Sequence, residues 1–247
     1  MIRRLLDLPE RAVEAFRGML LPVHPLQIDV LKAIACVCML IDHINTCLFD
    51  RASVWAWLIG RLAFPLFSFT FVVTLTESNA LRTAKRTAAA GVLVQPIYAV
   101  AFADAGFSPW WAGNILISFA VVAYLVELVK ALTWSNIVQA VALLMLASVV
   151  QAPSSFGVAG IAFMLALWFT LHRVAPCIGS AVAAVAFLNL NPGALAVSVS
   201  MALALVLILF ASGALRASPP RRLLHPRATL WFYAGHLAVI GSLVSSF

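Results

Sequence analysis

The chain has 247 residues, of which 64% are hydrophobic and only 10% are charged, and its mean hydropathy is +1.04. Because a water-soluble domain of this size carries about 25% charged residues, the composition excludes a soluble fold and predicts an integral membrane protein. The formal net charge of +7 comes from lysines and arginines between apolar segments, which indicates membrane topology and not a nucleic-acid site.

The first 22 residues have the pattern of an amphipathic helix. Their apolar residues fall near one helical face and their arginines occupy much of the rest, which predicts a helix on the cytoplasmic interface and not a signal peptide. The apolar face comprises Ile2, Leu5, Leu6, Val13, Phe16 and Leu20. The stretch PVHP at 22–25 then breaks this helix and turns the chain into the bilayer.

Nine apolar segments follow and predict a single transmembrane domain over residues 27–247. Most approach the roughly 20 residues that a spanning helix needs. The fifth to seventh segments are shorter, so a count of eight or ten spans is also compatible with the sequence. The predicted spans are 27–49, 54–77, 84–104, 112–132, 136–152, 156–171, 175–190, 194–215 and 228–246. The expected fold is an all-α, polytopic helical bundle of about nine transmembrane helices, preceded by the interfacial helix.

Lysine and arginine are distributed unevenly between alternate connections. With the N-terminus inside, the outer connections contain only Arg51, whereas the inner connections hold all the other cations between spans. These are Arg82, Lys85, Arg86, Lys130, Arg173, Arg216, Arg221, Arg222 and Arg227. The pattern predicts an N-in/C-out topology. No internal repeat of the kind that builds many transporters is visible.

The four cysteines predict neither a metal site nor a disulfide framework. Cys36, Cys38, Cys47 and Cys177 all lie in apolar segments, and their spacing matches no zinc motif. We therefore predict no bound metal.

Charged residues interrupt three spans at similar depth. Asp42 and His43 lie beyond the middle of the first span. Arg61 lies in the outer half of the second span, and His236 lies near the middle of the last. Burying one charge at a helix centre costs roughly 2.5–3.5 kcal/mol, so these residues should pair or line a wet cavity. An Asp–Arg or Asp–Lys bridge would only fix helix packing, whereas the two histidines favour a reaction site.

Three further positions admit two interpretations. Asn114, at the outer start of the fourth span, is either a helix cap or a functional residue. Lys32, near the inner interface, either snorkels to water or belongs to a site. Tyr233 lies three residues before His236, so the two side chains are neighbours on one helical face.

Two stretches carry a family resemblance. LKAIACVCMLIDHI at 31–44, followed by IGRLAFPLFSF at 59–69, resembles the paired signature of the TraX family of conjugative-pilus proteins. Shorter pieces follow in the order expected of that family: QPIY (95–98), GNILISF (113–119), FGVAGI (156–161) and FYAGHL (232–237).

The resemblance implies an activity and a location. It implies acetylation of the N-terminal amine of a pilin subunit, with acetyl-CoA as donor, by a multi-pass protein of the bacterial inner (cytoplasmic) membrane. It implies His43 as general base with Asp42 holding its ring, and Arg61 as stabiliser of the tetrahedral oxyanion. His236 would be a second proton carrier or a transient acyl acceptor.

The resemblance also implies binding roles. The phosphates of CoA would favour a basic cytoplasmic mouth, for which the candidates are Lys32, Arg82, Lys85, Arg86, Arg221 and Arg222. Asn114 and Tyr233 are the candidate substrate-binding residues. Two other functions stay open, namely a transporter or channel with a buried-charge relay, and a non-catalytic membrane protein of pilus assembly. The pattern predicts no nucleic-acid partner and makes no prediction of oligomeric state.

Overall fold

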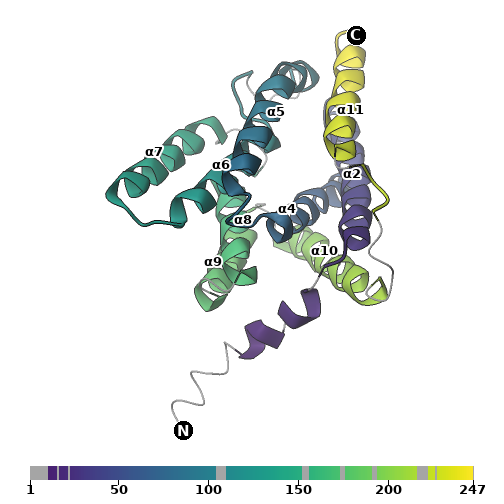
Figure 1. Cartoon of the computed structure of the whole chain (residues 1–247). Coiled ribbons are helices and arrows are strands. Elements are labelled where there is room, and N and C mark those ends of the chain that lie inside the picture. The colour runs from purple at the N-terminus through teal and green to yellow at the C-terminus, as the bar shows by residue number, and fades with distance from the viewer. Residues whose placement is uncertain are drawn as a thin grey trace.

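A computed structural model of the chain describes residues 11–15, 17–21, 23–103, 110–151, 156–172, 176–190, 194–215, 222–225 and 227–246. Within these ranges every regular element is a helix and none is a strand, so the all-α prediction is confirmed there. The helices are α2 (Pro25–Cys47), α3 (Val54–Gly60), α4 (Ala63–Thr74), α5 (Ala80–Ala101), α6 (Ile115–Val129), α7 (Trp134–Gln151), α8 (Gly157–Leu171), α9 (Pro176–Leu188), α10 (Ala194–Ala214) and α11 (Ala228–Val244) (Figure 1).

Each of the nine predicted spans contains helix at the expected place, but the second is broken between Gly60 and Ala63. By length and composition, Val54–Thr74 and Trp134–Gln151 could cross a membrane, and Arg11–Leu20 together with α2 forms a third candidate bent by 87°. Five further apolar helical stretches are shorter, namely Ile115–Val129, Gly157–Leu171, Pro176–Phe187, Ala202–Ala214 and Ala228–Val244. The described helices are compatible with a membrane protein, while nine spans and the N-in/C-out topology stay predictions.

Part of the predicted interfacial helix is described, and its residues 11–15 and 17–20 are helical. Residues 1–10, Phe16, Arg173, Arg216 and Arg221 lie outside the described residues.

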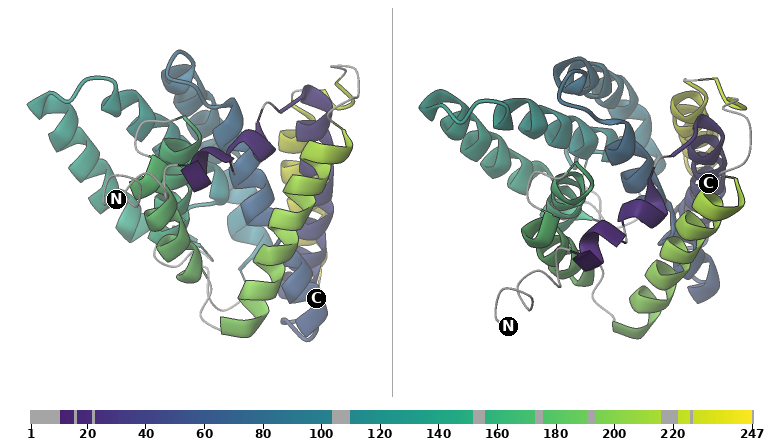
Figure 2. Two further views of the ribbon diagram at one scale, coloured as in Figure 1. Left: turned by 90° about the horizontal axis from the view of Figure 1, so that it is seen from below. Right: turned by 60° about the horizontal axis from the view of Figure 1, so that its bottom comes forward.

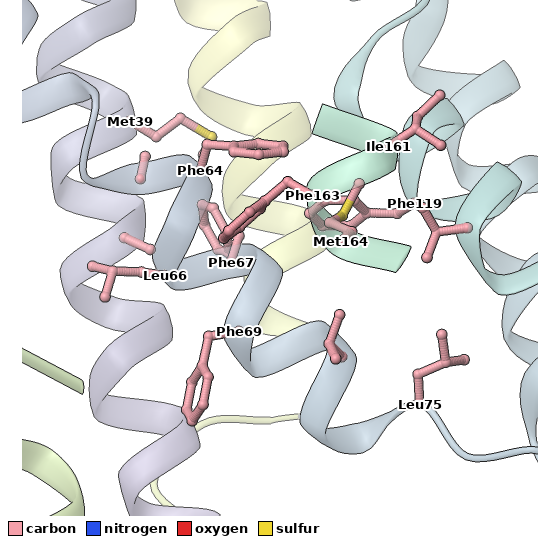
Figure 3. Close-up of a cluster of buried hydrophobic side chains, with 14 of the residues drawn as sticks. Met39, Phe64, Leu66, Phe67, Phe69, Leu75, Phe119, Ile161, Phe163 and Met164 are labelled. Carbon is pink, nitrogen blue, oxygen red and sulfur yellow. The ribbon is translucent and has the colours of Figure 1, made fainter. Parts of the chain in front are cut away.

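The helix α4 lies at the centre of the bundle and packs against α2, α8 and α10. All its residues from Ala63 to Thr70 are buried. Figure 3 shows Phe64 and Phe67 of α4 beside Met39 of α2 and Phe163 of α8. A helix that is apolar on all faces is expected only where protein surrounds it. The packing of α4 therefore fixes the residues at its N-terminal end.

The other helices pack mainly on one another. The helices α2 and α11 pack together at one edge of the bundle, α11 also packs on α5, α5 packs on α6, and α8 packs on α9 (Figures 1 and 2). The helix α7 lies at the opposite edge and contacts α6 and α8, with only 11% of its residues buried.

Two hydrogen bonds join segments that were predicted to lie on the same side of the membrane. At the predicted inner end, Asp29 Oδ2 of α2 accepts a hydrogen bond from the backbone amide of Leu223 at 2.8 Å. At the other end, the amide of Gly113 donates to the carbonyl of Val150 at 3.0 Å. Alternating spans require such a grouping.

Candidate functional site

A cavity of about 330 Å³ lies between the C-terminal half of α2, the α3–α4 break and α11. Asp42 and His43 line it from α2, Arg61 from the break and Tyr233 from α11. This volume is at the lower end of the range of small-molecule sites, roughly 300–1,000 Å³. Four residues singled out in the sequence therefore share one cavity, and His236 contacts His43.

Asp42 and Arg61 form a buried ion pair. Arg61 Nη2 donates to Asp42 Oδ2 at 2.9 Å, and the two side chains are only 7% and 14% exposed respectively. The guanidinium also lies 5.5 Å from the ring centroid of Trp57 and 5.1 Å from that of Phe156. Cation–π contacts of this kind hold a guanidinium in a fixed orientation. Arg61 is thus a preoriented charge at the wall of the cavity.

Gly60 allows the ion pair to form. A Cβ at this position would overlap Asp42, so α2 and α3 can approach this closely only because residue 60 has no side chain. The next residue, Arg61, lies in the two-residue gap before α4, which directs its side chain toward α2.

His43 and His236 form a hydrogen-bonded pair between α2 and α11. His43 Nδ1 lies 2.7 Å from His236 Nε2, and His236 Nδ1 lies 2.8 Å from the backbone carbonyl of Phe232. A carbonyl oxygen can only accept, so His236 Nδ1 carries a proton, and in a neutral ring Nε2 then accepts from His43 Nδ1–H. This network leaves Nε2 of His43 as the nitrogen with a free lone pair. The rings of His43 and Phe102 are nearly perpendicular, and their centroids lie 5.1 Å apart.

The family resemblance implies that Asp42 holds the ring of His43, but the hydrogen-bond partners in the structure are different. The structure pairs Asp42 with Arg61 and pairs His43 with His236. Successive residues of a helix point about 100° apart, so Asp42 faces α3 while His43 faces α11. The ring of His43 is therefore oriented by His236. Within the described residues, Asp42 Oδ1 is buried and has no hydrogen-bond partner.

Asn114 is a helix cap that also ties two helices together. Its side chain accepts from the amide of Leu116 at the start of α6, as an N-cap does. Its Nδ2 donates to the Gly91 carbonyl and to Gln95 Oε1, both at 2.8 Å. Asn114 is fully buried, and it is the neighbouring Gly113 that lines the cavity.

The cations expected to bind CoA phosphates lie away from the cavity. Arg82, Lys85 and Arg86 are exposed near the start of α5, whereas Tyr98 near its end lines the cavity. With 1.5 Å of rise per residue, these cations lie about 18–24 Å along the helix from Tyr98. Lys32 precedes His43 by eleven residues of α2, or about 16 Å.

Three aromatic side chains and one glycine shape the site without having been singled out in the sequence. Trp57 and Phe102 are ordinary residues of apolar segments that no motif distinguishes, whereas Phe156 begins the piece FGVAGI of the family resemblance. Gly60 does leave a signal, because it directly precedes the charged Arg61 within an apolar segment.

The structure also describes the four cysteines, which are all free. Among the residues that it describes, no group of three or more His, Cys, Asp or Glu side chains could hold a metal ion.

Comparison with known proteins assigns the chain to a family. Residues 27–244 match the sequence model described as TraX protein. The chain belongs to the TraX family. Protein TraX of Escherichia coli is 31% identical over 237 residues, covering 89% of this chain and 88% of the relative. Protein TraX of Escherichia coli strain K12 is 35% identical over 238 residues, covering 91% and 90% respectively. No solved structure gives a significant match.

The stretches that carried the resemblance form the site of this TraX chain. Residues 31–44 lie in α2 and include Asp42 and His43, while residues 59–69 contain the α3–α4 break with Arg61. The short piece at 232–237 supplies Tyr233 and His236.

Proposed function

We propose that this TraX-family protein is a membrane-embedded acyltransferase of the bacterial inner membrane. In this proposal it transfers the acetyl group of acetyl-CoA to the N-terminal amine of a conjugative pilin subunit. The observation that carries the proposal is the hydrogen-bond network through His43, His236 and the Phe232 carbonyl, which leaves an unprotonated nitrogen on a cavity-lining histidine. Family membership supports the link to conjugative transfer.

His43 acts as general base in the proposed reaction. The neutral amine forms an N–C bond to the thioester carbonyl carbon, and His43 Nε2 accepts the proton that the nitrogen loses. When the tetrahedral intermediate collapses, the C–S bond breaks, and the protonated His43 returns the proton to the sulfur of CoA. The products are an acetylated amine and a free thiol. His236 keeps accepting from His43 Nδ1–H and so holds the ring throughout.

Arg61 stabilises the negative charge that develops on the carbonyl oxygen. Asp42 and the rings of Trp57 and Phe156 fix the guanidinium before the substrate arrives, so little reorganisation is needed in the transition state. Tyr233 lines the same cavity and is a candidate contact for the substrate.

The size of the cavity limits what it can enclose. About 330 Å³ suits the reacting ends of two substrates and not a whole CoA molecule, whose nucleotide must lie outside. Lys32, Arg82, Lys85 and Arg86 remain candidates for its phosphates, provided that the thioester arm extends from their end of the bundle toward the cavity.

A transport function has less support, because the layer next to the cavity is mostly apolar. The ring centroids of Phe71 in α4 and Phe119 in α6 lie 4.7 Å apart, and those of Phe64 and Phe163 of α8 lie 6.2 Å apart. A proton or solute relay across the membrane would need a continuous polar path at this level, whereas the buried polar side chains of α4 are only the hydroxyl groups of Ser68 and Thr70.

The test is the intact mass of the cognate pilin from cells that carry either wild-type protein or the variant His43→Ala. We expect an acetylated N-terminus with the wild type and at least a hundredfold slower modification with the variant, since general-base catalysis contributes about 10²–10⁴-fold.

The matched control is His225→Ala, which alters an exposed histidine outside the cavity. It should leave acetylation unchanged, and all three proteins should reach equal levels in the membrane. An unmodified pilin N-terminus in the wild-type cells would refute acetylation as the activity. A non-catalytic assembly protein would give this result.

A further inference from the structure

Arg51 lies in the connection between α2 and α3 and is exposed, yet it lines the same cavity as Asp42, His43 and Arg61. The mechanism proposed above does not use it. Its position at the open side of the cavity suggests contact with a part of the substrate that extends outward.

The backbone at this position is strained and firmly held. Asp50 and Arg51 have φ values of 43° and 60°, a left-handed conformation that residues with a Cβ rarely adopt. The Arg51 amide donates to the Asn45 carbonyl at 2.8 Å. The Asn45 side chain accepts from the Ser53 amide at 3.0 Å and donates to its carbonyl at 2.9 Å. Strain maintained in this way is typical of functional sites.

The charges around the cavity favour an anion. Its charged lining consists of two guanidinium groups, Arg51 and Arg61, and the single carboxylate of Asp42. Arg61 contacts this carboxylate at 2.9 Å, and Arg51 also interacts with it electrostatically, so the two cations share one negative charge. In addition, Arg51 is the one cation that the predicted outer connections contain, so positive-inside sorting does not explain it. An excess of positive charge in a partly enclosed site attracts negatively charged ligands.

We propose that Arg51 forms an anion-binding subsite, which recognises a phosphate or carboxylate on the substrate whose reacting group lies beside His43. The subsite rests on the proposed transferase function for its place in a reaction. Its binding can nevertheless be measured without turnover. Two sources supply such an anion, namely the phosphates of the CoA donor and an acidic side chain near the amine of a peptide acceptor.

The experiment measures ligand affinity of the full chain in lipid nanodiscs for the wild type, Arg51→Gln and Arg51→Lys. One probe pair is CoA and pantetheine, which share the thiol arm, whereas pantetheine lacks both the phosphates and the adenosine. A second pair is a short peptide with a free amine and one glutamate, and the same peptide with glutamine. We expect Arg51→Gln to weaken one anionic probe by roughly tenfold to a hundredfold, as the loss of a charged hydrogen bond does, and to spare its neutral match. Arg51→Lys should restore part of that affinity.

The matched control is Arg227→Gln, an exposed cation that does not line the cavity and has no proposed role in binding. Loss of CoA affinity in Arg51→Gln alone assigns the subsite to the donor, and loss of glutamate-peptide affinity assigns it to the acceptor. If the wild type binds the acidic peptide through Arg51 but does not bind CoA, the subsite stands and the acetyl-CoA proposal fails. Unchanged affinity of Arg51→Gln for both anionic probes would overturn the subsite, even where the wild type binds CoA.

Discussion

The ring nitrogens of His43 and His236 determine which atom of the site can act as a base. The hydrogen bond to the Phe232 carbonyl fixes Nδ1 as the protonated nitrogen of His236. His236 Nε2 must then accept, which fixes Nδ1 as the protonated nitrogen of His43. The carbonyl belongs to the backbone of α11, so this assignment does not depend on a flexible side chain. A histidine in the middle of an apolar helix thus acquires a defined tautomer.

The hydrogen-bond network that fixes the His43 tautomer predicts different effects for two substitutions of His236. His236→Gln keeps an acceptor, the amide oxygen, for His43 Nδ1–H, and it should retain much of the acetylation rate. His236→Phe fills similar space without an acceptor and should slow acetylation by about a hundredfold, because the other His43 tautomer becomes accessible. Initial rates of pilin acetylation at equal membrane levels measure the difference. Equal rates for the two variants would contradict the positioning role.

Gly60 provides a second test at the level of single residues. Gly60→Ala places a methyl group where Asp42 lies, so it should separate Asp42 from Arg61 and cost about 1–3 kcal/mol of stability. Acetylation should fall with it. Gly235→Ala is the matched control, since a Cβ there meets no atom within 4 Å although the residue adjoins His236. Thermal unfolding in detergent and the acetylation rate should both remain near wild type in the control.

The Asp42–Arg61 pair allows stability to be separated from chemistry. Asp42→Leu or Arg61→Leu alone leaves one buried charge without its partner and should cost about 3–5 kcal/mol, whereas the double variant should recover much of that loss. Activity should stay low in all three proteins, because the oxyanion donor or its orientation is missing. A double variant that regained acetylation would show that the pair serves packing only.

At the level of elements, hydrogen bonds around Asn114 join the part of α5 next to Pro96 to the start of α6. Gln95 lies next to Pro96, which leaves a gap in the helical hydrogen-bonding pattern of α5, and the Gln95 side chain contacts both Asn114 and the Ala112 carbonyl. Gly113, between these residues, lines the cavity. Side-chain hydrogen bonds between α5 and the start of α6 thus fix this part of the cavity wall.

Asn114→Ala should therefore destabilise the protein more than it impairs substrate binding. Loss of the cap costs about 1 kcal/mol, and interhelical hydrogen bonds in membranes contribute about 0.6 kcal/mol each. The unfolding temperature should fall, while the apparent KM for the pilin should change less than twofold. Asn189→Ala, at an exposed residue with only a local hydrogen bond, is the control. A large rise in KM at unchanged stability would instead favour direct substrate contact.

The sequence predicts the positions of the helices better than their breaks and partners. Apolar length and Gly/Pro punctuation locate the segments, because lipid and core both select apolar residues over a whole helix. The break at Arg61 depends on contacts with Asp42 and on aromatic rings from distant segments, which no local pattern encodes. Likewise, the depth of His43 could be predicted, but its hydrogen-bond partner depends on how α2 is rotated relative to α11.

At the scale of the whole molecule, the cavity and the cations of α5 lie toward opposite ends of the bundle. In the predicted topology the cavity is nearer the outer side and the cations are cytoplasmic. An acetyl donor from the cytoplasm and an acceptor at the outer side would then reach the site from different directions.

Reporter fusions test this topology directly. Alkaline phosphatase, which is active only outside the cytoplasm, should be active when fused after Phe247 and inactive when fused after Asn79. A fusion after Ser53 should be active, since the connection carrying Arg51 is predicted to be outer. Cytoplasmic behaviour of the fusion after Phe247 would rule out nine spans with the N-terminus inside.

If the predicted spans insert into a membrane, the contact between Asp42 and Arg61 also bears on their insertion during synthesis. The two residues are 19 positions apart, and the short connection between α2 and α3 is fixed by hydrogen bonds from Asn45 to Ser53. Each charge alone would oppose insertion by roughly 2.5–3.5 kcal/mol. If α2 and α3 leave the translocon together as a hairpin, the charges are already neutralised when they meet lipid. The pair is then a requirement of biogenesis as well as of the finished site.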